Sequence, residues 1–140
     1  MRPIGINGFG RIGKCIFLIL LYHNDFCVSA INAPDFDIQK MDKYLNNDTV
    51  HKYSKDFSIE IVDNDNFKIN GHVVHIFRDR DPKNISWNEY NIEIVVDATG
   101  AFLTEDKIRL HNTKFSIMTA PPKDKTPMFV YGANHTKYKG

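Results

Sequence analysis

The sequence has few cysteines, almost no net charge and no long apolar run, and each shortage excludes a class of protein. Cys15 and Cys27 are its two cysteines, so no disulfide framework holds a small secreted domain together. A formal net charge of +1 provides no overall field that attracts nucleic acid or a membrane surface. The apolar run at residues 16–22 is too short to cross a bilayer. We therefore expect a protein of the reducing cytoplasm.

A signal peptide is the alternative interpretation of the N-terminus. Arg2, Arg11 and Lys14 precede the apolar run, and Val28-Ser29-Ala30 resembles a cleavage site. Cleavage there would remove the glycine motif described below before it served a purpose. We favour a helix that is apolar nearly all round and is buried between a sheet and a covering layer. A length of 140 residues, 42% of them hydrophobic and 25% charged, is typical of one globular domain.

The decapeptide IGINGFGRIG at residues 4–13 organises the chain. It predicts a strand at residues 3–7, a glycine turn and a helix at residues 14–23. In the G-x-G-x-x-G pattern, Gly8 permits the tight turn, Gly10 lets a pyrophosphate approach the backbone, and Gly13 lets helix and strand pack closely. The free N–H groups and positive dipole end of the helix then face the anion.

The rest of the chain alternates strands and helices, which predicts an α/β fold with a Rossmann-type doubly wound, mainly parallel sheet. We expect further strands at residues 26–32, 92–97, 115–119 and 128–131. Helices are predicted at residues 38–45, capped by Asp37, and at residues 105–111, capped by Thr104. Residues 46–56 are polar and predict a loop. Residues 57–62, 67–70 and 72–77 predict a small antiparallel insertion around an Asn70-Gly71 hairpin turn.

Small or polar residues end the predicted parallel strands. Ligands of an open parallel sheet bind beyond the carboxyl ends of its strands. A crevice between such ends suits a flat, phosphate-bearing ligand, and the alternative is that small residues only turn the chain. The ends are Asn7-Gly8, Asn32-Ala33, Ala98-Thr99-Gly100 and Thr119-Ala120.

These residues also resemble a known family. The segment NGFGRIG at residues 7–13 is similar to the signature opening of glyceraldehyde-3-phosphate dehydrogenases. Shorter matches follow in the family's order over the whole chain, and together they are highly specific. They are Ala30-Ile31-Asn32, Asp48-Thr49-Val50-His51, Ile69-Asn70-Gly71, Arg80-Asp81-Pro82, Ala98-Thr99-Gly100-Ala101-Phe102, Ala120-Pro121, and Pro127-Met128-Phe129-Val130 through Asn134-His135.

The resemblance implies that residues 1–140 are one NAD(P)-binding Rossmann domain, and it implies roles for individual residues. Arg80 would lie by the adenine, where a guanidinium stacks on a base, or else form a surface pair with a nearby Asp. The alternative to a cofactor contact is that Phe102 packs in the core and that Thr119 makes a hydrogen bond at the end of a strand. The implied contacts are Asn7, Gly8, Phe9, Gly10, Arg11, Ile12 and Gly13 for the pyrophosphate, Asn32 and Ala33 at the ribose-reading position, Arg80 for the adenine, Thr99, Gly100 and Phe102 under the nicotinamide-side ribose, and Thr119 through its hydroxyl.

Ala33 is the first departure from the family pattern. The family normally has Asp at this position, where the carboxylate accepts hydrogen bonds from the adenosine ribose. Its absence removes an attraction for the diol and a repulsion against a 2′-phosphate. Asp35 is two residues away and could substitute, although Pro34 limits how the loop moves. We therefore expect weak NAD binding with blurred discrimination against NADP.

The second departure concerns catalysis. The family's nucleophilic cysteine belongs to a Ser-Cys-Thr-Thr motif beyond Asn134-His135, and its histidine and substrate-phosphate residues come later still. Gly140 precedes all of them. Cys15 and Cys27 match neither motif nor place, and we expect both to be inert core residues. The six histidines share no metal-ligand spacing. The catalytic domain is thus expected to be absent, with no catalytic or metal-binding residue in this chain.

The predicted function has two levels. The gene product resembles a glycolytic enzyme for the oxidative phosphorylation of glyceraldehyde 3-phosphate, and this chain resembles its cofactor-binding domain, inactive alone. One alternative is a non-catalytic module that binds NAD, ATP or single-stranded RNA, although near-neutral charge disfavours strong RNA binding. Another is an assembly piece that joins family tetramers or a separate C-terminal catalytic chain. We expect self-association or such a partner, because apolar residues 16–22 and 128–131 lose cover.

Overall fold

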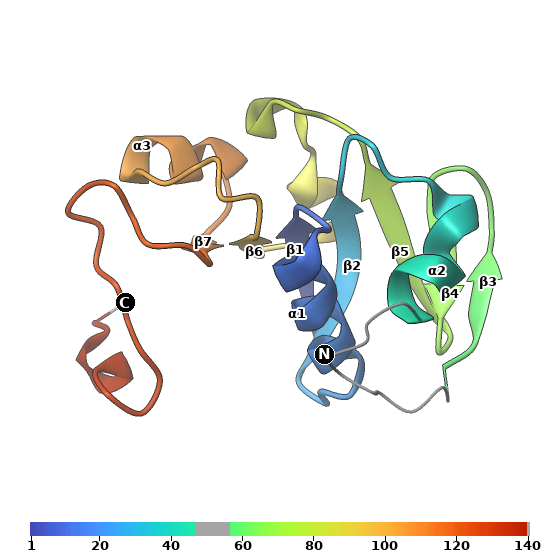
Figure 1. The fold of residues 1–140 in the computed structure, drawn as a ribbon, viewed down its shortest axis with the longest axis horizontal. Coiled ribbons are helices and arrows are strands. Elements are labelled where there is room, and N and C mark those ends of the chain that lie inside the picture. The colour runs from blue at the N-terminus through green and yellow to red at the C-terminus, as the bar shows by residue number, and fades with distance from the viewer. Residues whose placement is uncertain (47–56, 140) are drawn as a thin grey trace.

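One mixed sheet organises the computed structural model, which describes residues 1–46 and 57–139 (Figure 1). Its strands follow the order β3-β4-β5-β2-β1-β6-β7. Neighbours from β5 to β7 run parallel, whereas β4 pairs antiparallel with both β3 and β5. The chain begins in the middle, builds one side of the sheet and then crosses to the other. This topology confirms the predicted Rossmann-type fold with an antiparallel insertion. The bounds are Arg2–Asn7 for β1, Phe26–Asn32 for β2, Ile59–Ile61 for β3, Asn66–Ile69 for β4, His72–Phe77 for β5, Ile94–Asp97 for β6 and Phe115–Met118 for β7.

Three α-helices connect these strands in the described part of the chain. Helix α1 spans Arg11–Leu21, so it begins three residues earlier than predicted, directly after the glycine turn. A 3₁₀ turn at Ile38–Lys40 leads into α2, Met41–Asn46, and α3, Glu105–Ile108, continues as a 3₁₀ turn at Arg109–His111. Other 3₁₀ turns are Pro82–Asn84, Trp87–Tyr90 and His135–Lys137. The predicted loop at 46–56, from residue 47 on, and the family match at 48–51 lie outside the described residues.

Two hydrophobic clusters hold the sheet from its two faces. The larger cluster joins Phe17 and Leu18 of α1 to buried strand residues such as Ile6 and Phe67. The smaller one surrounds Trp87, which is 1% exposed. Each cluster covers one face of the sheet. The carboxyl ends of the parallel strands remain as the edge where a ligand is expected. Among the described residues, no helix is long and apolar enough to span a membrane.

Helix α1 is not buried all round, which corrects the sequence prediction. Phe17 and Leu18 face the sheet, but Ile12 and Ile19 are 50% and 51% exposed. The two pairs lie on opposite sides of the helix, and within the described chain only one side contacts the core. The composition of a helix shows how apolar it is, but not whether a second layer covers it.

Residues 128–131 do not form the predicted strand. Their backbone is bound by one downstream amide: Asn134 accepts from the N–H of Val130 at 2.6 Å through Oδ1 and donates to the carbonyl of Met128 at 3.1 Å. These bonds form a turn and use the backbone N–H and carbonyl groups that would otherwise pair with a neighbouring strand in a sheet. The strand prediction was therefore wrong, because apolar β-forming residues cannot pair when a local side chain binds their backbone.

The predicted caps and turn have mixed outcomes. Asp37 accepts from the N–H of Gln39 at 3.1 Å, which confirms it as a cap. Thr104 makes no capping bond through its side chain, and the N–H of Glu105 donates to Oδ2 of Asp124 at 2.8 Å instead. A carboxylate from a distant loop thus replaces the predicted local cap. The Asn70-Gly71 turn has positive φ at both residues, 48° and 82°, as a two-residue hairpin requires.

Candidate dinucleotide-binding site

The three motif glycines have three different surroundings, as their spacing predicts. Gly8 has φ of +94°, and a Cβ there would lie 2.9 Å from Cγ2 of Thr99. A Cβ on Gly13 would lie 2.1 Å from the carbonyl oxygen of Gly8, so the helix packs directly on the strand end. By contrast, a Cβ on Gly10 would meet no atom within 4 Å. The turn is therefore tight at its base and open at the middle glycine.

The N-terminus of α1 adjoins this open glycine. Gly10 is the N-cap and provides no side-chain hydrogen bond, and the first turn contains no acidic residue. Its N–H groups and positive dipole end are suited to a phosphate. Arg11 and Ile12 are exposed beside it. Phe9 differs, because the residue is 9% exposed and its ring packs edge-on against Phe17 and Phe36. The Phe9 side chain is therefore a core group, and only its backbone is available to a ligand.

Below the turn, a row of buried polar side chains crosses the strand ends. Asn32 donates to Oδ1 of Asn7 at 2.7 Å, and Asn7 donates to Oδ2 of Asp97 at 2.7 Å. Nε2 of His111 lies 2.9 Å from the same Asp97 oxygen, and the indole N–H of Trp87 donates to Nδ1 of His111 at 3.3 Å. Sequence reasoning predicted the two asparagines and missed the other three residues. An acidic residue at the end of the apolar run at 92–97 was the available signal.

Asp97 is ionised at the centre of this row. Oδ1 accepts from both the N–H and the hydroxyl of Thr99, at 3.0 and 2.6 Å, while Oδ2 accepts from Asn7 and His111. Burial raises the pKa of the Asp97 carboxyl, but the hydrogen bonds from His111, Thr99 and Asn7 outweigh it, so its pKa lies below the usual value. An indole N–H only donates, so Nδ1 of His111 accepts and Nε2 carries the proton.

The predicted nicotinamide-side residues gather around the end of β6. Thr99 binds Asp97, and its hydroxyl accepts from the N–H of Ala101 at 3.1 Å, in a turn where Gly100 has φ of +69°. The hydroxyl of Thr119 donates to the carbonyl of Asp97 at 3.1 Å, which is the strand-end hydrogen bond considered as an alternative. Phe102 packs edge-on against the ring of His111. The structure brings these four residues together.

The predicted adenosine-side residues lie beyond β2 and β5. Ala33 donates its N–H to the carbonyl of Phe77 at 2.9 Å. Nη2 of Arg80 lies 3.2 Å from Oδ1 of Asp35, and these side chains are 76% and 89% exposed. The surface pair with a nearby Asp is thus present. Because so exposed a pair contributes little to stability, both side chains are free to exchange partners when a ligand arrives.

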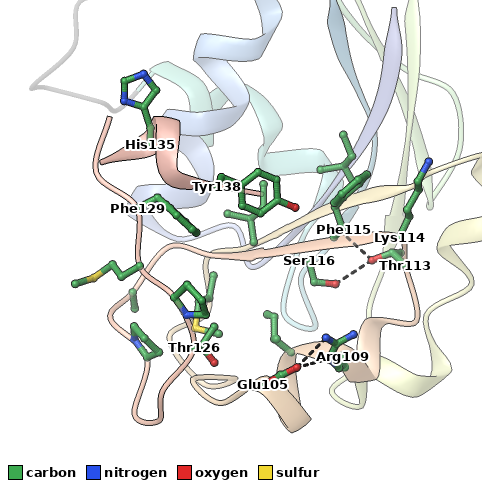
Figure 2. Close-up of a pocket in the computed structure, with 18 of the residues that line it drawn as sticks. Glu105, Arg109, Thr113, Lys114, Phe115, Ser116, Thr126, Phe129, His135 and Tyr138 are labelled. Atoms are coloured by element: carbon green, nitrogen blue, oxygen red, sulfur yellow. Dashed lines mark hydrogen bonds and ion pairs between the residues drawn. The ribbon is translucent and has the colours of Figure 1, made fainter. Parts of the chain in front are cut away.

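A hollow of a different kind lies between β7, α3 and the C-terminal segment. Its volume is about 1110 Å³, and it contains none of the predicted site residues. Figure 2 shows Phe115, Phe129 and Tyr138 around it, with the Glu105–Arg109 pair at one side. Its aromatic lining differs from the polar strand-end edge, so it is a separate surface.

The two cysteines correct another prediction. Both were expected in the core, yet both are half-buried. Cys15 lies on α1, and Sγ of Cys27 lies 3.8 Å from the hydroxyl of Ser29. Within the described ranges, no cluster of three or more His, Cys, Asp or Glu side chains could hold a metal ion.

Comparison with known proteins shows the family of the chain. The NAD-binding domain model of glyceraldehyde 3-phosphate dehydrogenase matches residues 2–105. The cytosolic glyceraldehyde-3-phosphate dehydrogenase of Trypanosoma brucei brucei is 41% identical over 98% of this chain and 41% of its own length. The glyceraldehyde-3-phosphate dehydrogenase of Bacteroides fragilis is 39% identical over 100% of this chain and 43% of its own length. Glyceraldehyde-3-phosphate dehydrogenase A of Escherichia coli K12 is 41% identical over 98% of this chain and 41% of its own length. The chain thus spans about two fifths of the length of these relatives. It belongs to the glyceraldehyde-3-phosphate dehydrogenase family and carries that family's NAD-binding domain.

Proposed function

We propose that the chain binds NAD across the strand ends, with its pyrophosphate at Gly10 and the N-terminus of α1. The observation that carries this is the open space at Gly10 between two glycines that admit no side chain. Adenosine would lie toward Ala33 and Arg80, and the nicotinamide half toward Thr99. The proposed contacts are Asn7, Gly8, the backbone of Phe9, Gly10, Arg11, Ile12, Gly13, Asn32, Ala33, Arg80, Thr99, Gly100, Phe102 and Thr119.

Residues 1–140 as a whole serve, in this proposal, as the cofactor-binding part of a glycolytic glyceraldehyde-3-phosphate dehydrogenase. Bound NAD would accept the hydride in that oxidation. The 140 residues contain no Ser-Cys-Thr-Thr segment, and neither Cys15 nor Cys27 lies among the proposed contacts. The chain alone is therefore proposed to hold and orient the cofactor without catalysis. Relatives from Trypanosoma brucei brucei and Leishmania mexicana are named cytosolic, which supports the same compartment here.

Cofactor choice gives the first prediction. Isothermal titration with NAD and NADP is expected to show saturable binding of both, with less than about a hundredfold preference for NAD. The reason is that Ala33 neither attracts the ribose diol nor repels a 2′-phosphate, while Arg80 can turn from Asp35 to a phosphate. Ala33→Asp restores the missing carboxylate, and we expect it to increase the preference for NAD by about tenfold.

Gly10→Val is the control for the site itself. The backbone at Gly10 has φ of −80°, which any residue adopts, and the space around it is open. The variant is expected to melt at nearly the native temperature but to lose both cofactors, because its side chain occupies the proposed pyrophosphate position. Failure of the native chain to bind either cofactor would refute the function. A preference above a hundredfold would refute only the discrimination argument.

We also propose that the chain self-associates through the apolar edge beyond β7 when no C-terminal catalytic chain is present as a partner. Ile117 is 51% exposed on the outermost parallel strand, and Met128, which lines the same hollow, is 59% exposed. Val130 and Tyr131, which follow in the chain, are 55% and 90% exposed. Sedimentation velocity is expected to show a concentration-dependent mass above the 16.2 kDa monomer. Ile117→Lys should shift it to monomer, whereas Val73→Lys, equally exposed on β5, should not. A monomer at all concentrations contradicts the proposal.

A further inference from the structure

His111 sits in a position from which it can order the cofactor site without touching a ligand. Its side chain is 0% exposed. It lies at the end of the 3₁₀ turn Arg109–His111, fourteen residues beyond the strand end that it contacts. Both ring nitrogens are used: Nδ1 accepts from Trp87, and Nε2 donates to Asp97. A buried imidazole with both nitrogens bonded has a fixed orientation, so it can orient its partner in turn.

The partner, Asp97, passes this orientation to a ligand-facing turn. Its other oxygen accepts two bonds from Thr99, and Thr99 then accepts from the N–H of Ala101. These bonds set the turn containing Gly100. A methyl-sized group on Gly8 would touch the Thr99 side chain, so the same turn also abuts the glycine loop. Movement of the Asp97 carboxylate would therefore displace the Thr99 turn, on which the nicotinamide half is proposed to rest.

The opposite end of the row provides an internal reference. Asn32 binds the backbone of Asp79 twice, donating to its carbonyl at 2.8 Å and accepting from its N–H at 2.9 Å. These bonds hold the segment directly before Arg80, on the adenosine side. Two side chains separate them from Asp97: among the described residues, Asn32 bonds to Asn7, and Asn7 bonds to Asp97. A change at His111 should thus affect the two halves of the dinucleotide unequally.

We propose that His111 is a positioning residue of the cofactor site, which acts through Asp97 to fix the Thr99 turn under the nicotinamide half of the dinucleotide. Trp87 takes part by holding the imidazole, since its N–H selects the tautomer that donates to Asp97. The inference rests on the proposed NAD function and adds residues that no ligand would contact. A shift of this turn costs affinity only for ligands that reach it.

The test compares NAD with AMP and nicotinamide mononucleotide on the 140-residue chain, by NMR titration. His111→Leu removes the donor to Asp97 and fills similar space. We expect NAD and nicotinamide mononucleotide to bind about tenfold more weakly, the effect of one lost charge-assisted hydrogen bond, and AMP to bind within about twofold of native. His111→Gln can still donate to Asp97, and it should recover most of the NAD affinity.

The outcomes separate the inference from the function beneath it. If the native chain binds neither NAD nor AMP, the proposed function fails. If His111→Leu weakens AMP as much as NAD, or if His111→Gln recovers nothing, the positioning role fails while the function stands. Circular dichroism establishes that each variant is folded. Should His111→Leu not fold, Trp87→Phe keeps one aromatic ring in the smaller core and removes the indole N–H together with the second ring. The same selective loss of NAD over AMP is then required of that variant.

Discussion

Gly13→Ala is expected to lower the free energy of unfolding by about 3 kcal/mol or more and to abolish NAD binding. The added Cβ would lie 2.1 Å from the Gly8 carbonyl oxygen and 3.0 Å from its carbon, which are backbone atoms that cannot rotate away. Helix α1 cannot retreat cheaply, because Phe17 and Leu18 fix it in the larger core. Urea denaturation followed by circular dichroism measures the loss.

Gly10→Ala makes the same chemical change in the same motif and is the matched control. The new methyl would meet no atom within 4 Å, and φ of −80° suits alanine. Because alanine is a poorer N-cap than glycine, we expect the substitution to cost up to about 1 kcal/mol, well below the loss for Gly13→Ala. The pair therefore separates the packing role of one glycine from the ligand-access role of the other. Equal destabilisation by the two substitutions would show that helix propensity, not the approach of α1 to β1, governs the motif.

Local patterns made much of the fold predictable. The alternation of strands and helices depends on residues close in sequence, and β2 and β5 have their predicted bounds. The hairpin turn followed from Asn70-Gly71, because a two-residue connection needs two positive φ angles. The glycine surroundings followed from the spacing of Gly8, Gly10 and Gly13, because that spacing fixes where a helix can meet a strand. For the hairpin turn and for Gly13, the determining contact lies within a few residues.

Contacts between distant residues explain what the sequence could not predict. The cap of α3 comes from Asp124, whose carboxylate accepts a hydrogen bond from the N–H of Glu105, nineteen residues earlier in the chain. The predicted local cap, Thr104, makes no such bond through its side chain. Asn7 and Asp97 are ninety residues apart and meet only because β1 pairs with β6. The strand expected at 128–131 fails because Asn134 takes its backbone groups. Side-chain competition of this kind has no signature in hydrophobic periodicity.

Asp97→Asn is expected to destabilise the fold by about 3 kcal/mol at neutral pH, although it conserves shape. The carboxylate accepts from four donors, two on each oxygen. An amide offers one oxygen, so its NH₂ group must face the donors of Thr99 or those of Asn7 and His111. Two of the four donors then lose their charged acceptor. Asp63→Asn is the matched control, because that carboxylate is exposed and water can replace its bonds, so its substitution should cost far less.

The acid dependence of stability tests the same bonds independently. The folded state holds the pKa of Asp97 below its ordinary value, because the hydrogen bonds outweigh the effect of burial. The unfolded chain therefore binds this proton more readily, and stability from the ionised carboxylate is fully present above about pH 4. It is lost as the pH falls from there through the folded pKa. Urea midpoints measured from pH 5 down to pH 2.5 should consequently fall more steeply for the native chain than for Asp97→Asn. Parallel curves would mean that folding does not shift the pKa of Asp97, and a shallower curve for the native chain would mean that its carboxyl is protonated in the fold. Either result contradicts the charge that the four donors require.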